Sequence, residues 1–238
     1  MPTTQRKKTS EALKVRTHKN VGSKYVSSRP APATNKRSDT SQRLLAAAID
    51  MFGQKGFEST TMRDLARAVG IKAPAIYNHY PSKEEILAAS LIWVMEDFNQ
   101  QMFGRDDPGA APVERLKGIL ERYVLHQLDK PDLNEGFSVL LRGSALLRVQ
   151  RQDAQDEVMR LLSVFTSVMT AIVREIIKDV GDEAPPLVPA VHAIRTMYDQ
   201  IHRWYQPDGS ITPQQLIDTY WGFTARILGI PRRGSTGR

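Results

Sequence analysis

Apolar residues recur at helical spacing along most of the chain, and the alternating pattern of strands is absent. The clearest example is a pair of short runs between residues 60 and 87, separated by Gly70. The buried positions of the first run follow the spacing i, i+3, i+4 and i+7, at Met62, Leu65, Ala66 and Val69. Thr61 and Asp64 have the spacing of a capping box, and Gly70 can adopt the left-handed conformation that ends a helix. The pattern predicts an all-α protein with a helix-turn-helix.

The second run, from Ala73 to Tyr80, has the length of a recognition helix, with Ile76 as its inward anchor. Its small residues would let the backbone approach a DNA groove, and Asn78 is the best candidate for reading a base edge. We predict DNA contacts at Thr61, Arg63, Lys72, Ala73, Pro74, Ala75, Tyr77, Asn78, His79 and Lys83. The polar groups that can hydrogen-bond phosphates are those of Tyr77, His79 and Lys83. Taken alone, however, a two-helix corner can also be ordinary core packing.

Helical signals continue on both sides of this corner. Another amphipathic helix is expected from Thr40 to Gly56, so residues 39–83 would form a three-helix DNA-binding domain. Ser82 can cap a long helix that runs towards Phe103. Pro and Gly then divide the remainder of residues 84–230 into five further helices, expected at Val113–Leu128, Asn134–Val149, Asp153–Val180, Leu187–Tyr205 and Pro213–Leu228. The chain should therefore hold nine helices, three in the first domain and six in the second.

The stretch from Leu44 to Leu87 resembles the N-terminal domain of the TetR family of bacterial transcription regulators. The resemblance runs through the whole segment LLAAAIDMFGQKGFESTTMRDLARAVGIKAPAIYNHYPSKEEIL, including Phe52, Gly56, Phe57, Tyr77, Tyr80 and the PSKEE that opens the fourth helix. It implies that Tyr77, His79 and Lys83 contact phosphates, while residues 72–75 and Asn78 face the bases. Two residues depart from the family pattern: Lys72 replaces a capping Ser or Thr, and Pro74 replaces Gly. Pro is tolerated in the first turn of a helix, so the helix itself is still expected. The operator sequences of other family members, however, are a poorer guide to the one that this chain would recognise.

The last predicted helix carries more apolar surface than one packing contact would bury. One face holds the residues that we expect at a dimer interface, Leu216, Tyr220, Phe223 and Ile227, and a neighbouring face holds Ile217, Trp221 and Leu228. The family resemblance implies that the last two helices pair with those of a second chain, and a two-fold dimer matches the half-sites of a palindromic operator. A broad core within one chain is the alternative.

Positive charge is concentrated at the N-terminus. The chain has 33 Lys and Arg against 26 Asp and Glu, and residues 1–38 alone hold ten basic residues and a single acid, Glu11. These residues have almost no apolar periodicity, so we expect a disordered basic arm that can follow DNA phosphates. A solvated tail without specific contacts, or a transit peptide, would share this composition. Residues 231–238 are expected to form a second disordered tail.

The second domain should contain the site of a small apolar ligand. The segment Val191–Gly209, VHAIRTMYDQIHRWYQPDG, resembles TetR-family regulators that respond to acyl-CoA thioesters and control fatty-acid, sterol or aromatic-acid catabolism. We expect an apolar tunnel between the helices that contain residues 113–128, 139–149 and 161–177. Candidate ligand-binding residues, including basic groups for CoA phosphates, are Arg142, Arg148, Arg195, Tyr198 and Trp204. Alternatively, Trp204 only locks the turn and Arg195 only forms an ion pair.

Other classes of function are less well supported. The chain has no cysteine, and its five histidines lack the paired spacing of a metal site, so we expect no metal, no cofactor and no catalytic residues. No apolar run approaches the roughly 18 residues of a membrane helix, and we expect a cytoplasmic protein. The alternatives that stay open are a small all-helical enzyme acting on an apolar substrate and a DNA-binding dimer without a ligand.

Overall fold

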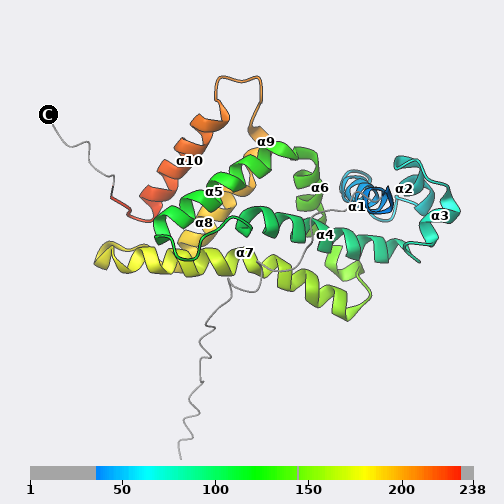
Figure 1. The fold of residues 1–238 in the computed structure, drawn as a ribbon, viewed down its shortest axis with the longest axis horizontal. Helices are drawn as coiled ribbons and strands as arrows, with labels where there is room; N and C mark the ends of the chain where they lie inside the picture. The colour runs from blue at the N-terminus through cyan, green and yellow to red at the C-terminus, as the bar shows by residue number, and fades with distance from the viewer. Residues whose placement is uncertain (1–35, 144, 232–238) are drawn as a thin grey trace, which may run out of the picture.

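The structure, a computed structural model, describes residues 36–143 and 145–231, and every regular element in this part of the chain is a helix (Figure 1). The predicted all-α fold is therefore confirmed. Three helices form one end of the molecule: α1 (Lys36–Lys55), α2 (Met62–Ala68) and α3 (Ala73–Tyr77). The predicted arm, residues 1–38, and tail, residues 231–238, lie outside the described residues, except for the backbone of residues 36–38 and residue 231.

Two long helices connect this end to the rest of the molecule. These are α4 (Lys83–Phe103) and α7 (Gln152–Lys178), which pack against each other (Figure 1). The other helices are α5 (Pro112–Asp129), α6 (Pro131–Arg142), α8 (Leu187–Asp199), α9 (Ile201–Trp204) and α10 (Pro213–Ile227), with 3-10 turns η2 (Ala145–Arg148) and η3 (Gly181–Glu183). Among the described helices, none is both long and apolar enough to cross a membrane.

Several predicted helix boundaries require correction. The first helix begins at Lys36 rather than at Thr40, because its first two turns are polar and carry no apolar period that could reveal them. The predicted helix Asn134–Val149 begins earlier, at Pro131, and ends at Arg142 before Gly143; a separate 3-10 turn follows. Pro131 is compatible with this start because the first turn of a helix needs no amide donor there.

The predicted helix Leu187–Tyr205 is also interrupted, at Gln200, which gives the described part of the chain ten α-helical segments instead of nine. Neither Gly nor Pro stands at the interruption, so the sequence offers no signal for it. Other boundaries agree well with the prediction: Ser82 caps α4 by accepting a hydrogen bond from the Glu85 amide, and Gly70 has a φ of 72° at the end of α2.

The buried apolar side chains form two clusters. The first joins α1–α3 to the first half of α4, to α6, and to the beginning of α7, so the end formed by α1–α3 has no separate core of its own. Within it, α1 and α6 cross at a pair of glycines. A Cβ added to Gly53 would lie 2.6 Å from the Gly136 Cα, and one added to Gly136 would lie 3.0 Å from the Ile49 carbonyl oxygen. Only glycine permits so close an approach of the two backbones.

The second cluster lies between α5, α8, α10, the end of α4 and the second half of α7. Aromatic rings fill its centre. The Tyr123 ring centroid lies 5.3 Å from that of Phe98, 5.0 Å from that of Phe165 and 5.9 Å from that of Tyr198, on which it stacks. Of the three segments predicted to line an apolar tunnel, residues 113–128 and 161–177 therefore meet through these rings, whereas residues 139–149 belong to the first cluster.

Candidate nucleic-acid interface

The start of α2 is fixed by a capping box. The Thr61 hydroxyl accepts a hydrogen bond from the Asp64 amide at 3.2 Å, and the Asp64 carboxylate accepts one from the Thr61 amide at 3.1 Å. These bonds satisfy two amide donors that a helix start would otherwise leave unpaired. The hydrogen bond from the Thr61 side chain also lowers the pKa of Asp64. Thr61, predicted to contact DNA, therefore has an observed structural role, and its DNA contact stays a prediction.

The exposed face of α3 carries most of the predicted DNA contacts. Ile76 is fully buried under the helix, whereas its neighbour Tyr77 is 55% exposed and Asn78 and His79 are exposed. Lys72 and Pro74 are exposed at the other end of α3, with Ala73 and Ala75 half-buried between them. The structure thus brings these predicted residues together on α3 and at its two ends, with Ile76 as the buried anchor. The helix ends at Tyr77 rather than at Tyr80 as predicted, so Asn78 is its C-cap and His79 follows it in a turn.

Lys83 lies in a different environment from the one expected of a free phosphate ligand. Its ammonium donates a hydrogen bond to the Phe57 carbonyl at 2.6 Å and lies 4.3 Å from the centroid of the Phe57 ring. Lys83 therefore joins the start of α4 to the turn between α1 and α2. A phosphate contact from Lys83 stays a prediction, and it would have to share or replace this hydrogen bond.

Four further polar side chains hold the corner in place, and the predicted site did not include them. The Ser41 and Tyr80 hydroxyls lie 3.2 Å apart, which connects α1 to the segment that follows α3. Arg43 donates to the Val69 carbonyl at 3.2 Å, and the Thr60 hydroxyl donates to the Gly56 carbonyl at 2.9 Å. Of these contacts, only the aromatic pattern around Tyr80 left a signal in the sequence, because the others depend on helix packing.

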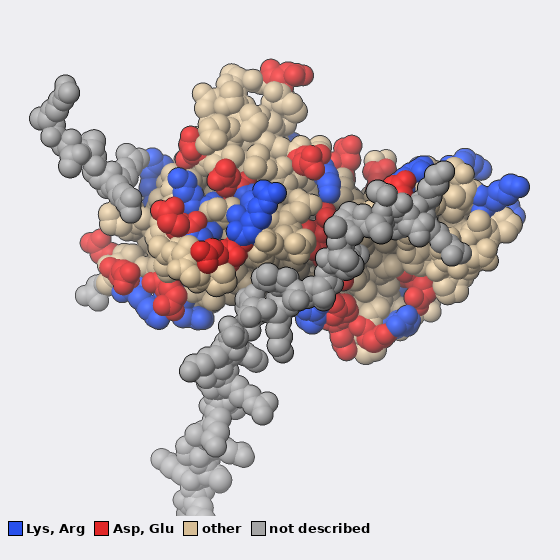
Figure 2. All heavy atoms as spheres, viewed as in Figure 1, with Lys and Arg blue, Asp and Glu red and all other residues tan. Residues whose placement is uncertain are grey.

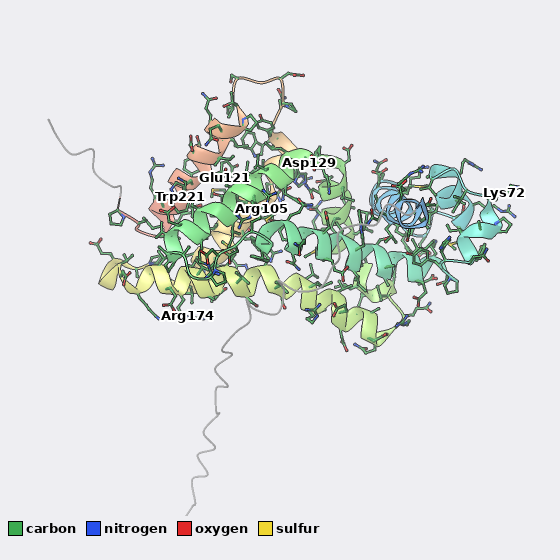
Figure 3. All side chains as sticks on the ribbon, in the orientation of Figure 1. Lys72, Arg105, Glu121, Asp129, Arg174 and Trp221 are labelled. Atoms are coloured by element: carbon green, nitrogen blue, oxygen red, sulfur yellow. The ribbon has the colours of Figure 1, made fainter. Side chains whose placement is uncertain are left out.

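Basic side chains gather at the end of the molecule that α2 and α3 form. Figure 2 shows Lys and Arg over this end, and Figure 3 places Lys72 at its tip. Arg63 and Arg67 are exposed on α2, although Arg67 approaches the Asp64 carboxylate to 3.8 Å. Such exposed pairs are weak, so the charge of Arg67 remains accessible to an anion.

Comparison with known proteins agrees with this geometry. Residues 44–90 match the model of the bacterial regulatory proteins of the tetR family, and residues 109–228 match the tetracyclin repressor-like C-terminal domain. The chain belongs to the TetR family. The second match covers the part of the chain for which sequence motifs are weakest, so the membership extends to both domains.

The relatives of this TetR-family chain span nearly its whole described length. The transcriptional repressor KstR2 of Rhodococcus jostii strain RHA1 is 24% identical over 205 residues, which cover 85% of this chain and 97% of that protein. A tetR-family regulatory protein from Rhodococcus RHA1 has a solved structure with a TM-score of 0.66 and 25% identity, covering 81% of this chain and 98% of that one. AibR, solved in complex with isovaleryl coenzyme A and operator DNA, has a TM-score of 0.64 and 20% identity, covering 77% and 97%.

The arginines predicted to meet a ligand lie at three separate places in this TetR-family structure. Arg148 reaches the DNA-binding end, where it pairs with Glu58 at 3.3 Å and its guanidinium carbon lies 5.7 Å from the Phe57 ring centroid. Arg142 pairs with Glu135 at 3.4 Å. Arg195 pairs with Asp199 at 3.4 Å, as the alternative interpretation of this residue expected. These three side chains therefore do not form one entrance to a ligand site.

Tyr198 and Trp204, also predicted to bind a ligand, pack against aromatic neighbours. Tyr198 is 1% exposed, its hydroxyl lies 3.3 Å from that of Thr224, and burial raises its pKa. Trp204 is 44% exposed and stacks on Tyr220, with ring centroids 6.3 Å apart. Tyr198 is thus part of the core in this conformation, whereas the exposed ring of Trp204 is accessible to a ligand or to another chain.

The predicted dimer residues divide in the same way. Leu216 and Tyr220 are 2% and 8% exposed in the chain's own core, so they have little surface left to bury against a partner. Both lie on the inner face of α10, which covers the second cluster, and their contact with a partner chain stays a prediction. Phe223 is 41% exposed and Ile227 is half-buried. The surface available to a second chain is therefore the outer side of α10.

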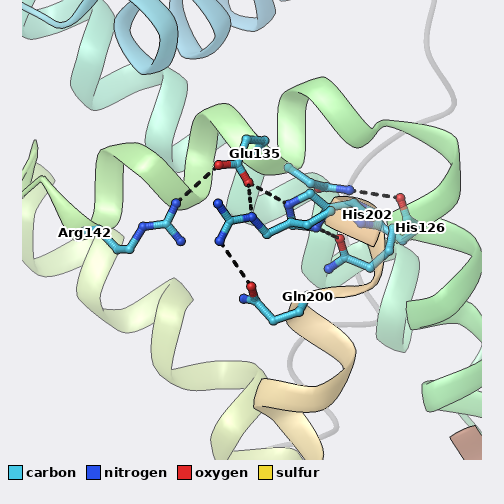
Figure 4. A network of polar contacts seen from close by, with 8 residues as sticks. His126, Glu135, Arg142, Gln200 and His202 are labelled. Atoms are coloured by element: carbon cyan, nitrogen blue, oxygen red, sulfur yellow. Dashed lines mark hydrogen bonds and ion pairs between the residues drawn. The ribbon is translucent and has the colours of Figure 1, made fainter. Parts of the chain in front are cut away.

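A partly buried polar network links α9, α5 and α6 (Figure 4). The imidazole of His202 lies between the Gln127 side-chain oxygen, at 2.9 Å, and the Glu135 carboxylate, at 3.0 Å. Arg203 approaches the same carboxylate at 3.3 Å. Burial alone would raise the pKa of Glu135, but the hydrogen bond to His202 and the charge of Arg203 lower it. Glu135 is next to Gly136, so this network ends at the crossing of α6 with α1.

Proposed function

We propose that this chain is a DNA-binding transcriptional regulator that works as a homodimer in the cytoplasm and represses genes from a palindromic operator. The observation that carries the proposal is the C-terminal end of α3, where Tyr77 and the two residues that follow the helix, Asn78 and His79, are exposed while Ile76 is buried beneath it. This is the arrangement by which a recognition helix presents side chains to the major groove. The similarity to KstR2, a transcriptional repressor, and to AibR, which was solved with operator DNA, supports it.

The dimer proposal rests on the exposed apolar side chains of the C-terminal helices. Phe223 on α10, Trp204 on α9 and Val188 on α8 are 41%, 44% and 60% exposed. A second copy of the chain can cover this surface and place two α3 helices on the two half-sites of an operator. We therefore move the expected interface from Leu216 and Tyr220 to the outer side of the same helices.

The regulator should respond to a small apolar ligand, with an acyl-CoA thioester as the first candidate and lipid, sterol or aromatic catabolism as the process controlled. AibR was solved with isovaleryl coenzyme A, which supports this class of ligand. The network of His202 and Glu135 offers a mechanical route, because Glu135 precedes the glycine at which α6 touches α1. A ligand that binds better to one position of α6 would shift the orientation of α1 and of the DNA-binding end.

One observation favours a second candidate, a DNA-binding dimer that needs no ligand. Aromatic rings fill the centre of the second cluster, so a ligand could enter there only if Tyr123 or its neighbours moved. Under this candidate the regulatory domain would serve dimerisation alone.

A mobility-shift titration separates these candidates. The full chain is titrated onto DNA from upstream of its own gene and onto a scrambled fragment, with and without a panel of acyl-CoA thioesters. We expect tighter binding to the upstream fragment and release by at least one thioester. Specific binding that no thioester affects would favour the ligand-independent dimer, and the absence of DNA binding to either fragment would reject the regulator.

A further inference from the structure

An open pocket of about 750 Å³ lies away from the DNA-binding end, between the end of α4, the loop that follows it, α5 and the first residue of α10. Its volume falls in the range of small-molecule sites, roughly 300–1,000 Å³. The wall combines charged, polar and apolar side chains, among them Arg105, Arg122, Leu125, His126, Leu128 and Asp129. Arg105 and Asp129 are labelled in Figure 3. None of the ligand-binding residues expected from the sequence lines it.

The two arginines of the pocket lack acidic partners. Within the described part of the chain, neither Arg105 nor Arg122 has a carboxylate oxygen within 4.0 Å. The carboxylate of Asp106 pairs with Arg115 at 2.6 Å, and that of Asp97 pairs with Lys130 at 3.1 Å, so both are already neutralised. Asp129 is exposed and forms no ion pair with either arginine.

Arg122 is held in place without being neutralised. Its Nε donates to the Met102 carbonyl at 2.8 Å, which fixes the guanidinium at the wall of the pocket. Burial lowers the pKa of Arg122 despite the nearby charges of Asp106 and Glu121, as expected for a partly buried cation without a close counter-ion. A fixed, partly desolvated guanidinium is a strong hydrogen-bond donor to a carboxylate or a phosphate.

His126 is a buried, uncharged side chain next to the two arginines. It is 5% exposed and lines the pocket, and its buried Nδ1 has no hydrogen-bond partner in the described part of the chain. Burial and the charge of Lys130 lower its pKa to about 4, so the imidazole is neutral near pH 7 and can both donate and accept. Native structures rarely leave such a buried polar atom without a partner.

The apolar side of the pocket adjoins the aromatic centre of the domain. Leu125 is 45% exposed on α5, and the His126 ring centroid lies 5.2 Å from that of Phe98, which belongs to the aromatic cluster. An apolar group in the pocket would therefore cover Leu125 and lie close to the rings of the second cluster.

We propose that this pocket binds an amphiphilic anion, whose carboxylate or phosphate pairs with Arg105 and Arg122 and whose apolar part covers Leu125 and Leu128 beside His126. Ligand binding in this pocket does not depend on the proposed function. Only the effect of that binding on transcription rests on the proposed function. A ligand bound beside Phe98 would contact the edge of the aromatic cluster and could displace its rings.

The test is calorimetric titration of the full chain, without DNA, with decanoate, decanoyl-CoA, decanol and coenzyme A. We expect decanoate or decanoyl-CoA to bind at least about tenfold more tightly than decanol and coenzyme A, because only these two join a charge to a chain. Arg105→Gln and Arg122→Gln should each weaken that binding about tenfold or more, the effect of losing one charge-assisted hydrogen bond. The matched control is Arg174→Gln, an exposed residue of α7, and thermal melts establish that each variant is folded.

Binding of decanoate identifies a carboxylate ligand, and binding of decanoyl-CoA alone identifies a phosphate ligand; both support the pocket. The proposal is overturned if no probe binds, if decanol or coenzyme A binds as tightly as the amphiphilic anions, or if the folded Arg105 and Arg122 variants bind like the wild type. Because DNA is absent, these outcomes are independent of the regulator itself. A chain that binds the anions but no operator would keep the pocket and reject the proposed function.

Discussion

Ile76 and Tyr77 are neighbours in α3 with opposite surroundings, one fully buried and the other 55% exposed. The buried side chain fixes the helix, and the exposed one is available to a phosphate. This division was predictable from sequence, because it follows directly from helical periodicity. The position of Lys83 was not, because its hydrogen bond to the Phe57 carbonyl depends on how α4 meets the turn after α1.

Removing the Tyr77 hydroxyl should weaken binding to all DNA sequences alike. A single hydrogen bond to phosphate is worth about 1 kcal/mol, or about fivefold in affinity, and carries no base information. Fluorescence anisotropy of Tyr77→Phe on operator and on scrambled DNA measures this, with Tyr205→Phe in the second domain as the control. An affinity loss confined to the operator would argue against a phosphate contact.

Lys83 has two possible roles that one variant can separate. If Lys83 contacts a phosphate, Lys83→Ala should reduce the slope of log affinity against log salt by about one unit. If it serves only as the observed link to Phe57, the melting temperature should fall while the salt slope stays unchanged. We expect both effects, and an unchanged slope would withdraw Lys83 from the DNA interface.

His126 should make the fold sensitive to mild acid. The folded chain keeps this side chain neutral down to about pH 4, whereas the unfolded chain takes up a proton near the ordinary value of 6.5. The unfolded state therefore binds more protons in this interval, and the free energy of unfolding falls as the pH is lowered, by about 2 kcal/mol between pH 7.5 and 5.

Urea unfolding at these two pH values tests the assignment to His126. His126→Gln should lose about 2 kcal/mol less than the wild type over the interval, by the same linkage. The exposed His192→Gln is the control, with wild-type pH dependence expected. Equal pH dependence in wild type and His126→Gln would show that this imidazole is not held neutral by burial.

At the scale of elements, the crossing of α1 and α6 is the closest link between the two domains. Gly53→Ala would place a Cβ 2.6 Å from the Gly136 Cα, where backbone has to move. Overpacking of this kind costs about 1–3 kcal/mol, and the displaced α6 should also alter DNA affinity.

Urea unfolding and operator anisotropy measure both consequences of Gly53→Ala. The matched control is Gly118→Ala in α5, whose Cβ would meet no backbone atom and only the Arg122 side chain, at 3.3 Å. If Gly53→Ala has the same free energy of unfolding as the wild type, α1 and α6 can move apart without loss of stability. The glycine crossing would then not couple α6 to the DNA-binding end.

Helix ends marked by capping residues, such as Ser82 and Gly70, could be predicted from sequence because their chemistry is local. The interruption at Gln200 could not, because nothing in that residue disfavours a helix. The packing of the predicted ligand-binding region could not be predicted either. Tyr123, Phe165 and Tyr198 are far apart in sequence, and only the fold shows that the Tyr123 ring contacts the other two.

At the scale of the whole molecule, the account requires two chains, because one α3 helix reads a single half-site. Phe223→Glu would place a charge on the outer side of α10 and should raise the dimer dissociation constant at least about 30-fold, as loss of a buried aromatic anchor does. Analytical ultracentrifugation measures this, with Met159→Glu, an exposed residue of α7, as control. A folded Phe223→Glu chain that stays dimeric would place the interface elsewhere.

The most direct test of the account is selection of random double-stranded DNA by the full chain, followed by sequencing, for the wild type and for Asn78→Ala. The account predicts a palindrome for the wild type, with half-sites about 10 base pairs or a multiple apart, and a relaxed preference at one position of each half-site for Asn78→Ala. No enriched motif with the wild type would contradict the claim that this chain reads operator DNA.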